Sequence, residues 1–592
     1  MKKLLTGNEA VVQGAYEAGV TFAAGYPGTP STEILENIAP LKDVIVAEWA
    51  PNEKVALESV IGASYMGARA LATMKVVGLN VAADPLFSVC YSGVNGGLVI
   101  INADDPGLHS SQDEQDNRYY AKMAKAALLE PSDSQESKDM VLAGFEISEQ
   151  FDVPVIIRVT TRTCHSKSLV EIGERKEREL KPYQKKPMNY NLMPAHSKQL
   201  RVIAEERMRK LEEFSNTTSM NYIEWNNKQI GVIASGISFQ YAKEVFGTQA
   251  SYLKLGFTHP LPEQKIKEFA AQVERLYIIE ETEPYIEEKV KQLGIPCIGK
   301  EKIPNIGELN PSIIAKVLLG EEKPLIQYDA SVVAGRPPVL CAGCPHRGFF
   351  YELAKVKNVF LSGDIGCYAL GGANPFKSFD WSLCMGSSIS IAHGAQQTLK
   401  QNKSEQRVIA FIGDSTFMHT GVNSLLDIVF NKSNVITCIL DNRITGMTGH
   451  QENPASGYTL RGEKTRAVNI EELVKAIGIQ HVKVINPLQL DQIKEALAWA
   501  LEINEASVII TRWPCVLKRM TEDDQAEFNI GKAQCRVDEE TCIGCKQCIK
   551  TGCPALVFDK EQKKVKIDDS QCNGCEVCLQ VCPVSAITKV GE

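Results

Sequence analysis

Basic residues are not in excess in this 592-residue sequence. Its 64 lysines and arginines stand against 72 aspartates and glutamates, which gives a net charge of −8. A protein whose main partner is a nucleic acid needs a basic face for the phosphates, so we expect no nucleic-acid partner. Aromatic residues are few, at 7%, but the 44% of hydrophobic residues is enough to fill several buried cores.

A long uninterrupted apolar segment is also missing. The most apolar stretch, Val76–Ile101, contains Asp84, Pro85 and several glycines, which favours buried strands and turns over a membrane span. The start, Met1–Leu5, leads into the polar Thr6–Glu9, so the apolar centre of a signal peptide does not follow. We therefore expect a cytoplasmic protein that does not enter a membrane.

Apolar runs alternate with helical patterns along most of the chain, which predicts an α/β protein with several doubly wound parallel sheets. A small cysteine-rich α+β module is expected at the C-terminus. The predicted segments are an α/β domain at 1–165, a charged linker with a helix at 166–227, a second α/β domain at 228–325, a third at 330–520, and the cysteine-rich module at 533–592.

Eight of the 18 cysteines lie between Cys542 and Cys582, in two copies of one pattern. Each copy has three cysteines spaced by two residues and a later Cys-Pro, whereas a zinc site usually has two C-x2-C pairs. In such a pattern the later cysteine binds the other copy's [4Fe–4S] cluster. The predicted ligand sets are Cys542, Cys545, Cys548 and Cys582 for one cluster, and Cys553, Cys572, Cys575 and Cys578 for the other.

The module resembles two-cluster bacterial ferredoxins over its whole length. It departs from them by one extra residue before Cys553. Because so small a segment has little core of its own, we expect the clusters to be needed for its folding.

Two apolar strands are predicted in the third α/β domain, at 407–412 and 435–440, with a helix between them. Asp414 follows the first strand and Asn442 follows the second. The carboxyl ends of neighbouring parallel strands meet at one edge of a sheet, so these side chains should be close together. Oxygen ligands beside a glycine suit a magnesium-bound diphosphate. The alternative is an ordinary strand–turn–helix in which the aspartate caps the helix.

This segment resembles the thiamine-diphosphate motif, a Gly-Asp-Gly followed nearly thirty residues later by Asn. The resemblance implies that Asp414, the Asn442 side chain and the Ile444 carbonyl hold Mg²⁺, and that Gly413 and Ser415 lie at the diphosphate. Ser415 stands where the motif usually has its second glycine.

Thiamine enzymes use a glutamate that hydrogen-bonds to the cofactor's aminopyrimidine ring. Glu53 follows a predicted strand, and Ala56, Val60 and Gly62 follow it in a pattern that resembles the one around this glutamate. The resemblance implies that Glu53 is the catalytic residue, with Glu48 as the second choice. Without this resemblance, Glu53 would be only a favourable charge in the first turn of a helix.

The loop Gly25–Thr32 resembles the substrate loop of pyruvate:ferredoxin and related oxidoreductases, which places Thr29 near the substrate; taken alone, the loop is a turn that caps a helix. His109 is a weaker substrate candidate, since a lone histidine is usually structural. By the same resemblance, further residues lie at the cofactor: Cys344, His346, Asp364, Gly366 and Cys367.

The order of domains, together with Cys341–Gly348 and Asp441–Gly449, resembles the alpha subunits of indolepyruvate:ferredoxin oxidoreductases, within the 2-oxoacid:ferredoxin oxidoreductase family. The resemblance implies a pyrimidine-binding domain, a middle domain similar to the transketolase C-terminal domain and a diphosphate-binding domain. The cofactors would be thiamine diphosphate, Mg²⁺ and two [4Fe–4S] clusters.

The reaction that this implies is oxidative decarboxylation of indolepyruvate or phenylpyruvate with CoA, giving aryl-acetyl-CoA and CO₂ and reducing ferredoxin. No segment matches the family's remaining catalytic domain, so a separate beta subunit is expected, in a heterodimer or a larger assembly, with α2β2 favoured. The alternatives are another 2-oxoacid, such as pyruvate, 2-oxoglutarate or a branched-chain acid, and a non-redox thiamine lyase. The two halves of the cofactor site meet either within one chain or across a dimer interface.

Overall fold

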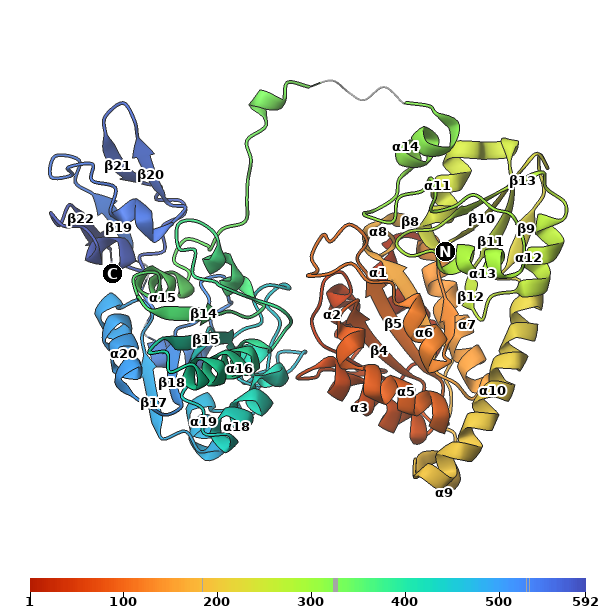
Figure 1. Ribbon diagram of the computed structural model, residues 1–592, viewed down its shortest axis with the longest axis horizontal. Helices are drawn as coiled ribbons and strands as arrows, with labels where there is room; N and C mark the ends of the chain where they lie inside the picture. The colour runs from red at the N-terminus through yellow and green to blue at the C-terminus, as the bar shows by residue number, and fades with distance from the viewer. Residues whose placement is uncertain (184, 323–327, 529, 532, 592) are drawn as a thin grey trace. The chain divides into compact units, whose positions relative to one another are not determined.

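The computed structural model describes residues 1–183, 185–322, 328–528, 530–531 and 533–591. The chain forms two compact units, residues 1–328 and 329–592, drawn from red to green and from green to blue in Figure 1. The predicted ends of the middle domain at residue 325 and of the C-terminal module at residue 592 lie outside the described residues.

The first unit is built on a seven-stranded sheet. Its strands are parallel except for one edge strand, and its central strands are buried along their whole length, as apolar strands covered on both faces are. In spatial order the strands are β12 (Phe257–His259), β6 (Ala127–Leu129), β7 (Val155–Thr160), β5 (Leu98–Asp104), β4 (Ala70–Lys75), β2 (Phe22–Gly25) and β3 (Val46–Trp49).

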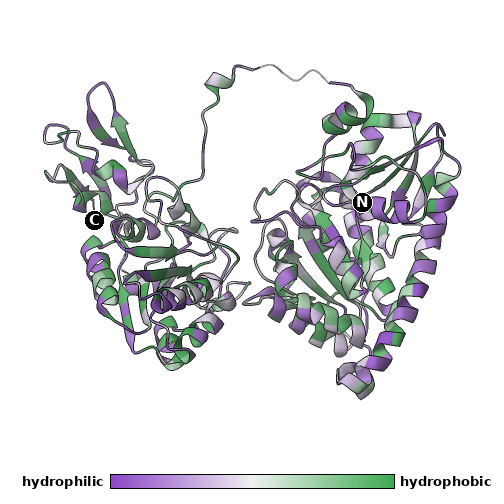
Figure 2. Ribbon diagram, viewed as in Figure 1, coloured by the Kyte–Doolittle hydropathy of each residue, from purple (hydrophilic) through white to green (hydrophobic). Residues whose placement is uncertain are grey.

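Helices cover this sheet. α3 (Glu53–Tyr65) and α5 (Ala83–Ser92) pack together beside β2 and β4, whereas α1 (Gly7–Glu17) packs against α7 (Ser134–Phe151). Figure 2 shows the strands as the most hydrophobic part of this unit. The parallel α/β architecture predicted for the N-terminal region is therefore confirmed.

A second sheet follows in the same unit. Its order is β13 (Arg275–Ile279), β10 (Ile230–Ser235), β11 (Ser251–Leu255) and β9 (Tyr222–Glu224), with β9 antiparallel. α11 (Gly236–Phe246) and α12 (Glu263–Ala270) lie between its strands along the chain, and α13 (Tyr285–Gln292) follows β13. β12 comes directly after β11 but pairs with β6 of the first sheet, so the chain itself joins the two sheets.

Buried charges also join these sheets. Arg118, at the start of α6 (Arg118–Ala124), donates to Glu280 Oε2 at 2.6 Å and to Asp116 Oδ1 at 2.9 Å, and all three side chains are buried. Thr282 donates to Asp116 Oδ2 at 2.8 Å. Burial alone would raise the pKa of Asp116, but Arg118 and Arg158 hold it well below its usual range.

The predicted charged linker contains a long helix, α10 (Pro194–Thr217). It is not fully solvated, because Leu200, Ala204 and Leu211 are buried and the helix packs on α5, α7 and α12. Figure 2 shows both hydrophilic and hydrophobic residues along this helix, and Val202 and Ile203 are hydrophobic residues that it exposes.

The second unit contains a five-stranded sheet in which every pairing is parallel. Separate apolar cores lie on its two faces, as in a doubly wound sheet. The strand order is β14 (Val359–Ser362), β15 (Arg407–Gly413), β16 (Ile436–Asp441), β18 (Ser507–Arg512) and β17 (His481–Ile485); the main helices are α15 (His346–Leu353), α16 (Ser388–Gln401), α18 (Val422–Phe430), α19 (Ile470–Ile477) and α20 (Leu490–Glu502).

The C-terminal module has two antiparallel strand pairs, as the α+β prediction requires. β19 (Gln534–Val537) pairs with β22 (Ile587–Val590), and β20 (Leu556–Asp559) pairs with β21 (Lys564–Ile567). The short helices η6 (Cys548–Thr551) and α22 (Val577–Gln580) follow the two cysteine runs. Among the described residues, no helix is both long and apolar enough to cross a membrane.

Glu281 gives a test of the buried charges between the first two sheets. Its carboxylate accepts a hydrogen bond from the Leu309 amide at 3.0 Å, and burial raises its pKa from 4.5 to about 7. Because the folded pKa lies above the unfolded one, the stability that Glu281 contributes is present below pH 4.5 and is lost as the pH rises through 7. At about 1.4 kcal/mol per pKa unit, the loss is about 3 kcal/mol.

The side chain in Glu281→Gln stays neutral at every pH. We therefore expect the free energy of unfolding of this variant to rise by about 3 kcal/mol relative to that of the natural protein between a pH of about 5 and about 8. Urea denaturation across this range measures the difference. Glu283→Gln, at an exposed position nearby, is the matched control. If both variants follow the natural protein at every pH, Glu281 does not titrate in this window.

Candidate functional site

The carboxyl ends of β15 and β16 lie side by side. The two strands are parallel, with Gly413 opposite Leu440, so Asp414 follows one strand beside the point where Asn442 follows the other. The predicted neighbours are therefore brought together. A Cβ atom at Gly413 would lie 2.7 Å from the ring of Tyr368, so only glycine fits at this strand end.

Asp414 is buried, and only one of its two carboxylate oxygens has a hydrogen-bond partner among the described residues. Its Oδ1 accepts a hydrogen bond from the Ser415 amide at 2.7 Å, but its Oδ2 has no partner among the described residues. Burial and the neighbouring Asp441 raise the pKa of Asp414 to about 8. Asn453 lies close by, and its Nδ2 also lacks a partner there. A cation beside Oδ2 would offset the cost of burying the charged form of this side chain.

Asn442 and His346 contact each other through their side chains. The Asn442 amide donates to His346 Nε2, with the nitrogens 3.3 Å apart, and burial lowers the pKa of His346 to about 4, so the ring is a neutral acceptor. The Ile444 amide donates to Asn442 Oδ1 at 3.2 Å. Thr445 donates to the Ser415 hydroxyl at 2.9 Å. The Ser415 hydroxyl therefore fixes the loop that contains Thr445, and a glycine has no side chain that could do so.

Asp364 lies at the end of β14, next to β15, and its role differs from that of Asp414. Its oxygens accept hydrogen bonds from the amides of Ile365, Gly386 and Ser388 at 2.7–2.9 Å. These contacts fix the loop that leads into α16. Gly366 lies against Tyr368, where a Cβ atom would be 2.3 Å from the ring.

Four thiols gather beside Asn442. The predicted Cys344 and Cys367 each lie close enough to Cys341 and Cys515 to interact with them electrostatically. Burial raises the pKa of Cys344 to about 12 and that of Cys367 to about 11. The Cys515 amide donates to the Asn442 carbonyl at 3.0 Å. Sequence reasoning missed Cys515 because nothing in its local sequence links it to a loop 170 residues earlier.

The first predicted cluster set is brought together. Cys542, Cys545, Cys548 and Cys582 line a single small pocket whose other walls are mainly apolar, among them Val537, Val565 and Ile587. Four sulfur donors in an apolar pocket fit a [4Fe–4S] cluster. Across the described chain, no three His, Cys, Asp or Glu side chains are arranged to hold one metal ion; the thiolates of a cubane are further apart than the ligands of a single ion.

The second predicted set is also brought together, with one addition. Cys553, Cys575 and Cys578 are within electrostatic range of one another. A fifth cysteine, Cys535, hydrogen-bonds with Cys578, and its amide donates to Cys572 Sγ at 3.3 Å. Cys535 lies on β19, outside the repeated pattern, so the spacing gave no signal for it.

The C-terminal module docks on the sheet domain at the second set. The buried Arg347 donates to the carbonyls of Thr551 at 2.9 Å and Cys341 at 2.8 Å. Asn573, between two cysteines of the second set, donates to the Ala342 carbonyl at 3.0 Å. Gln580 donates to the Leu488 carbonyl at 2.8 Å. The second set is therefore the one beside the Cys341–Cys344 loop.

In the first unit, Glu53 is the first residue of α3 and is buried. Asn52 caps the helix by accepting the Val55 amide at 2.9 Å. The Glu53 carboxylate packs on Gly78, where a Cβ atom would lie 2.7 Å from Oε1. Glu48, the second choice, is exposed on β3. The surroundings therefore favour Glu53.

The predicted substrate loop lies between β2 and α2 (Thr32–Ile38). Thr29 is half-buried, and its carbonyl accepts a hydrogen bond from the Ser110 hydroxyl at 3.2 Å. Neighbouring His109 is 46% exposed and faces Glu308 at 3.5 Å. Ser31 donates to the Gly28 carbonyl at 3.0 Å, so the loop carries the turn that its sequence predicts.

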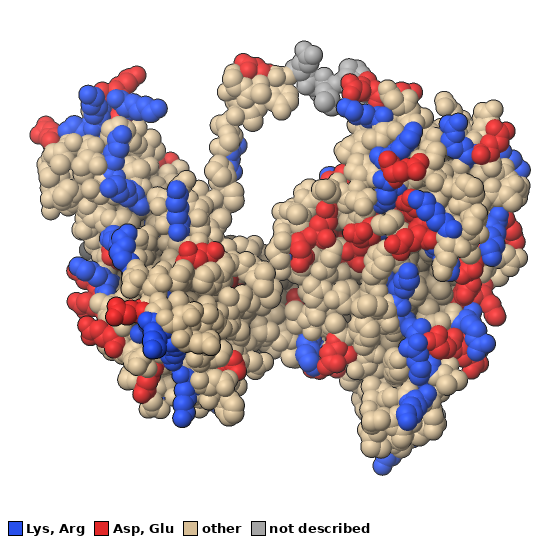
Figure 3. All heavy atoms as spheres, in the orientation of Figure 1, with Lys and Arg blue, Asp and Glu red and all other residues tan. Residues whose placement is uncertain are grey.

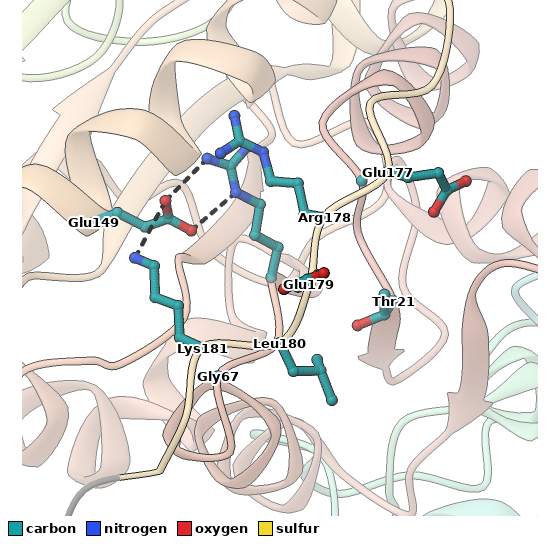
Figure 4. Close-up of a pocket in the computed structure, with 10 residues that line it drawn as sticks. Thr21, Gly67, Glu149, Glu177, Arg178, Glu179, Leu180 and Lys181 are labelled. Carbon is teal, nitrogen blue, oxygen red and sulfur yellow. Dashed lines mark hydrogen bonds and ion pairs between the residues drawn. The ribbon is translucent and has the colours of Figure 1, made fainter.

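A charged pocket lies at the amino ends of β2 and β4. Glu149 pairs there with Lys181 at 3.3 Å (Figure 4), and it also pairs with Arg69 at 2.9 Å. Arg178 at its rim pairs with Glu146 at 2.6 Å. These charges are satisfied within the protein, and in α/β sheets ligands bind at the carboxyl ends of strands. This pocket is structural.

Comparisons with known proteins agree with this geometry. Residues 13–225 match the thiamine-diphosphate-binding domain of pyruvate flavodoxin/ferredoxin oxidoreductases, 364–511 the C-terminal domain of thiamine pyrophosphate enzymes, and 535–589 the 4Fe–4S dicluster domain. The predicted thiamine diphosphate and iron–sulfur cofactors are confirmed.

Three curated relatives match almost the whole chain. The indolepyruvate oxidoreductase subunit IorA of Archaeoglobus fulgidus is 40% identical, over 99% of this chain and 97% of that protein. The same subunit is 39% identical in Pyrococcus horikoshii, over 100% and 97%, and 38% identical in Methanothermobacter marburgensis, over 99% and 97%. The chain therefore belongs to the IorA family of indolepyruvate oxidoreductase subunits, which are thiamine-diphosphate-dependent 2-oxoacid:ferredoxin oxidoreductases.

Proposed function

We propose that this chain oxidatively decarboxylates aryl pyruvates, indolepyruvate and phenylpyruvate among them. With CoA the products are an aryl-acetyl-CoA and CO₂, and two electrons pass to ferredoxin. The observation that carries the redox part is the docking of a two-cluster module directly on the domain that contains Asp414 and Asn442. The substrate class follows the names of the full-length relatives.

Thiamine diphosphate, when bound, supplies the carbanion chemistry that breaks the bond to the substrate carboxyl group. Asp414, Asn442 and the Ile444 carbonyl would hold its Mg²⁺, since the free Oδ2 of Asp414 leaves a buried position for a cation. Gly413 and Ser415 would lie at the diphosphate. His346, Gly366, Cys344 and Cys367 would line the same edge of the sheet.

Glu53 would hold and move the proton at the pyrimidine ring. A buried carboxylate at the start of a helix is fixed in direction by the cap at Asn52 and by the close contact with Gly78. Thr29 would contact the 2-oxoacid from its loop. These assignments rest on the burial and contacts of the residues and on the motifs.

The relatives are named as subunits, so a partner subunit is expected. We propose that it is a beta subunit, that the assembly is α2β2, and that CoA binds partly on the partner. A cytoplasmic location remains a prediction from the sequence.

The first test uses the clusters as the readout. The chain and its partner subunit are purified without oxygen, and Mg²⁺, thiamine diphosphate and CoA are added. We expect indolepyruvate and phenylpyruvate to bleach the visible absorbance of the clusters, because their electrons enter the module. Bleaching by pyruvate, 2-oxoglutarate or a branched-chain oxoacid instead would overturn the substrate class. No bleaching by any of them, with clusters and cofactor bound, would leave a non-redox thiamine enzyme.

A second test concerns the catalytic carboxylate. Glu53→Gln should lower the bleaching rate at least about 100-fold, the usual size of a lost proton transfer. Gly78→Ala should lower it as well, because the added methyl group displaces the Glu53 carboxylate. Glu48→Gln, at the exposed position, is the control and should stay near the natural rate. If Glu48→Gln is the slow variant, the two glutamates exchange roles.

A further inference from the structure

The C-terminal module has a basic face on a chain of net negative charge. Six lysines and only two acidic residues lie between Lys546 and Lys566. Figure 3 shows Lys and Arg side chains gathered over the β20–β21 hairpin, with a few acidic ones among them. The module as a whole is not basic, so the excess belongs to this face.

This face lies directly over the first cluster set. The turn of the β20–β21 hairpin rests on the loop between Cys542 and Cys545, since a Cβ atom at Gly544 would lie 2.1 Å from the Lys563 carbonyl oxygen. Lys564 Nζ donates to the Cys542 carbonyl. Lys546 lines the same pocket as the four cysteines.

The centre of the face is apolar. Ile543, between two cysteines of the first set, is 64% exposed, and Val557 on β20 is 55% exposed. Small exposed apolar centres surrounded by charge are typical of interfaces that form and separate quickly.

Several of the surrounding charges are free to act on a partner. Lys550, Lys560 and Lys563 are exposed and, among the described residues, have no acidic side chain within ion-pair distance. Lys566 is different, because it pairs with Asp559 at 3.0 Å and lies near Glu539.

The opposite side of the module is already occupied. Arg347, Asn573 and Gln580 hold the second cluster set against the sheet domain. Electrons that enter the module from the sheet domain therefore meet the second set first, and the first set is the one from which they leave.

We propose that the face formed by Ile543, Lys546, Lys550, Val557, Lys560 and Lys563 is the docking site of a small acidic one-electron carrier protein. The proposal rests on the proposed function for the origin of the electrons. In each encounter one electron leaves the reduced first cluster and reduces the metal centre of one carrier, and no bond or proton is transferred. A two-electron oxidation therefore requires two encounters.

The test is electron transfer from the full chain after photochemical reduction, so that it does not depend on the thiamine reaction. An acidic plant-type [2Fe–2S] ferredoxin is mixed with the reduced protein, and the second-order rate is followed by absorbance. The triple variant Lys550→Glu/Lys560→Glu/Lys563→Glu should lower this rate at least about tenfold at low salt, because attraction becomes repulsion. The rate of the natural protein should fall with added salt, whereas that of the variant should not.

The matched control is Lys357→Glu/Lys403→Glu/Lys432→Glu, which makes the same change of charge at exposed positions before β14, β15 and β16. It should keep the natural rate. Equal losses in both triple variants, or a natural rate independent of salt, would overturn the proposal. So would loss of the partner subunit from the docking variant in size-exclusion chromatography, which would assign the face to subunit contact.

Cluster content is checked by EPR of the reduced proteins. If the docking variant loads clusters poorly, the natural protein is tested with ferredoxin whose surface carboxylates have been amidated. The rate should then fall at least about tenfold, and an unchanged rate contradicts the proposal. Normal transfer to ferredoxin combined with no bleaching by any 2-oxoacid would refute the proposed function and leave the docking site standing.

Discussion

The guanidinium of Arg347 joins the two parts of the second unit that electrons must cross. It is 1% exposed, and it donates to a carbonyl of the cysteine-rich module and to a carbonyl of the Cys341 loop. A buried charge is tolerated only where polar groups surround it, so these carbonyls cannot move away without a large cost. Asn573 and Gln580 add hydrogen bonds between the same two parts. Together these contacts place the second cysteine set against the sheet domain.

The docking makes the two cluster sites unequal although their sequences repeat. The second set lies beside Arg347 and has the additional thiol of Cys535, whereas the first set lies in an apolar pocket under an exposed isoleucine. Charge, hydrogen bonds to sulfur and solvent exposure set the potential of such clusters. Two copies of one motif therefore differ because of their surroundings, and the two ends of the module are not equivalent for electron transfer.

Sequence reasoning succeeded where a local pattern determines a place in space. Asp414 and Asn442 were predicted as neighbours because parallel strands present their carboxyl ends at one edge, and the cysteine spacing predicted two sets of four cysteines, of which the first lines one pocket. It did not reach Cys515 beside Asn442, Cys535 beside Cys578, or Gly78 beneath Glu53. Each of these contacts joins segments whose local sequences show no shared period, motif or charge pattern, so only packing brings them together.

Asp364 and Asp414 show how surroundings, rather than residue type, decide a role. Both are buried aspartates at the ends of adjacent parallel strands, and both follow a glycine. Asp364 accepts three backbone amides, so both of its oxygens are engaged in fixing the loop before α16. Asp414 accepts one amide, faces Asp441 and keeps one oxygen unpaired. An unpaired buried oxygen costs free energy, and the Mg²⁺ proposed for this position would offset that cost when bound.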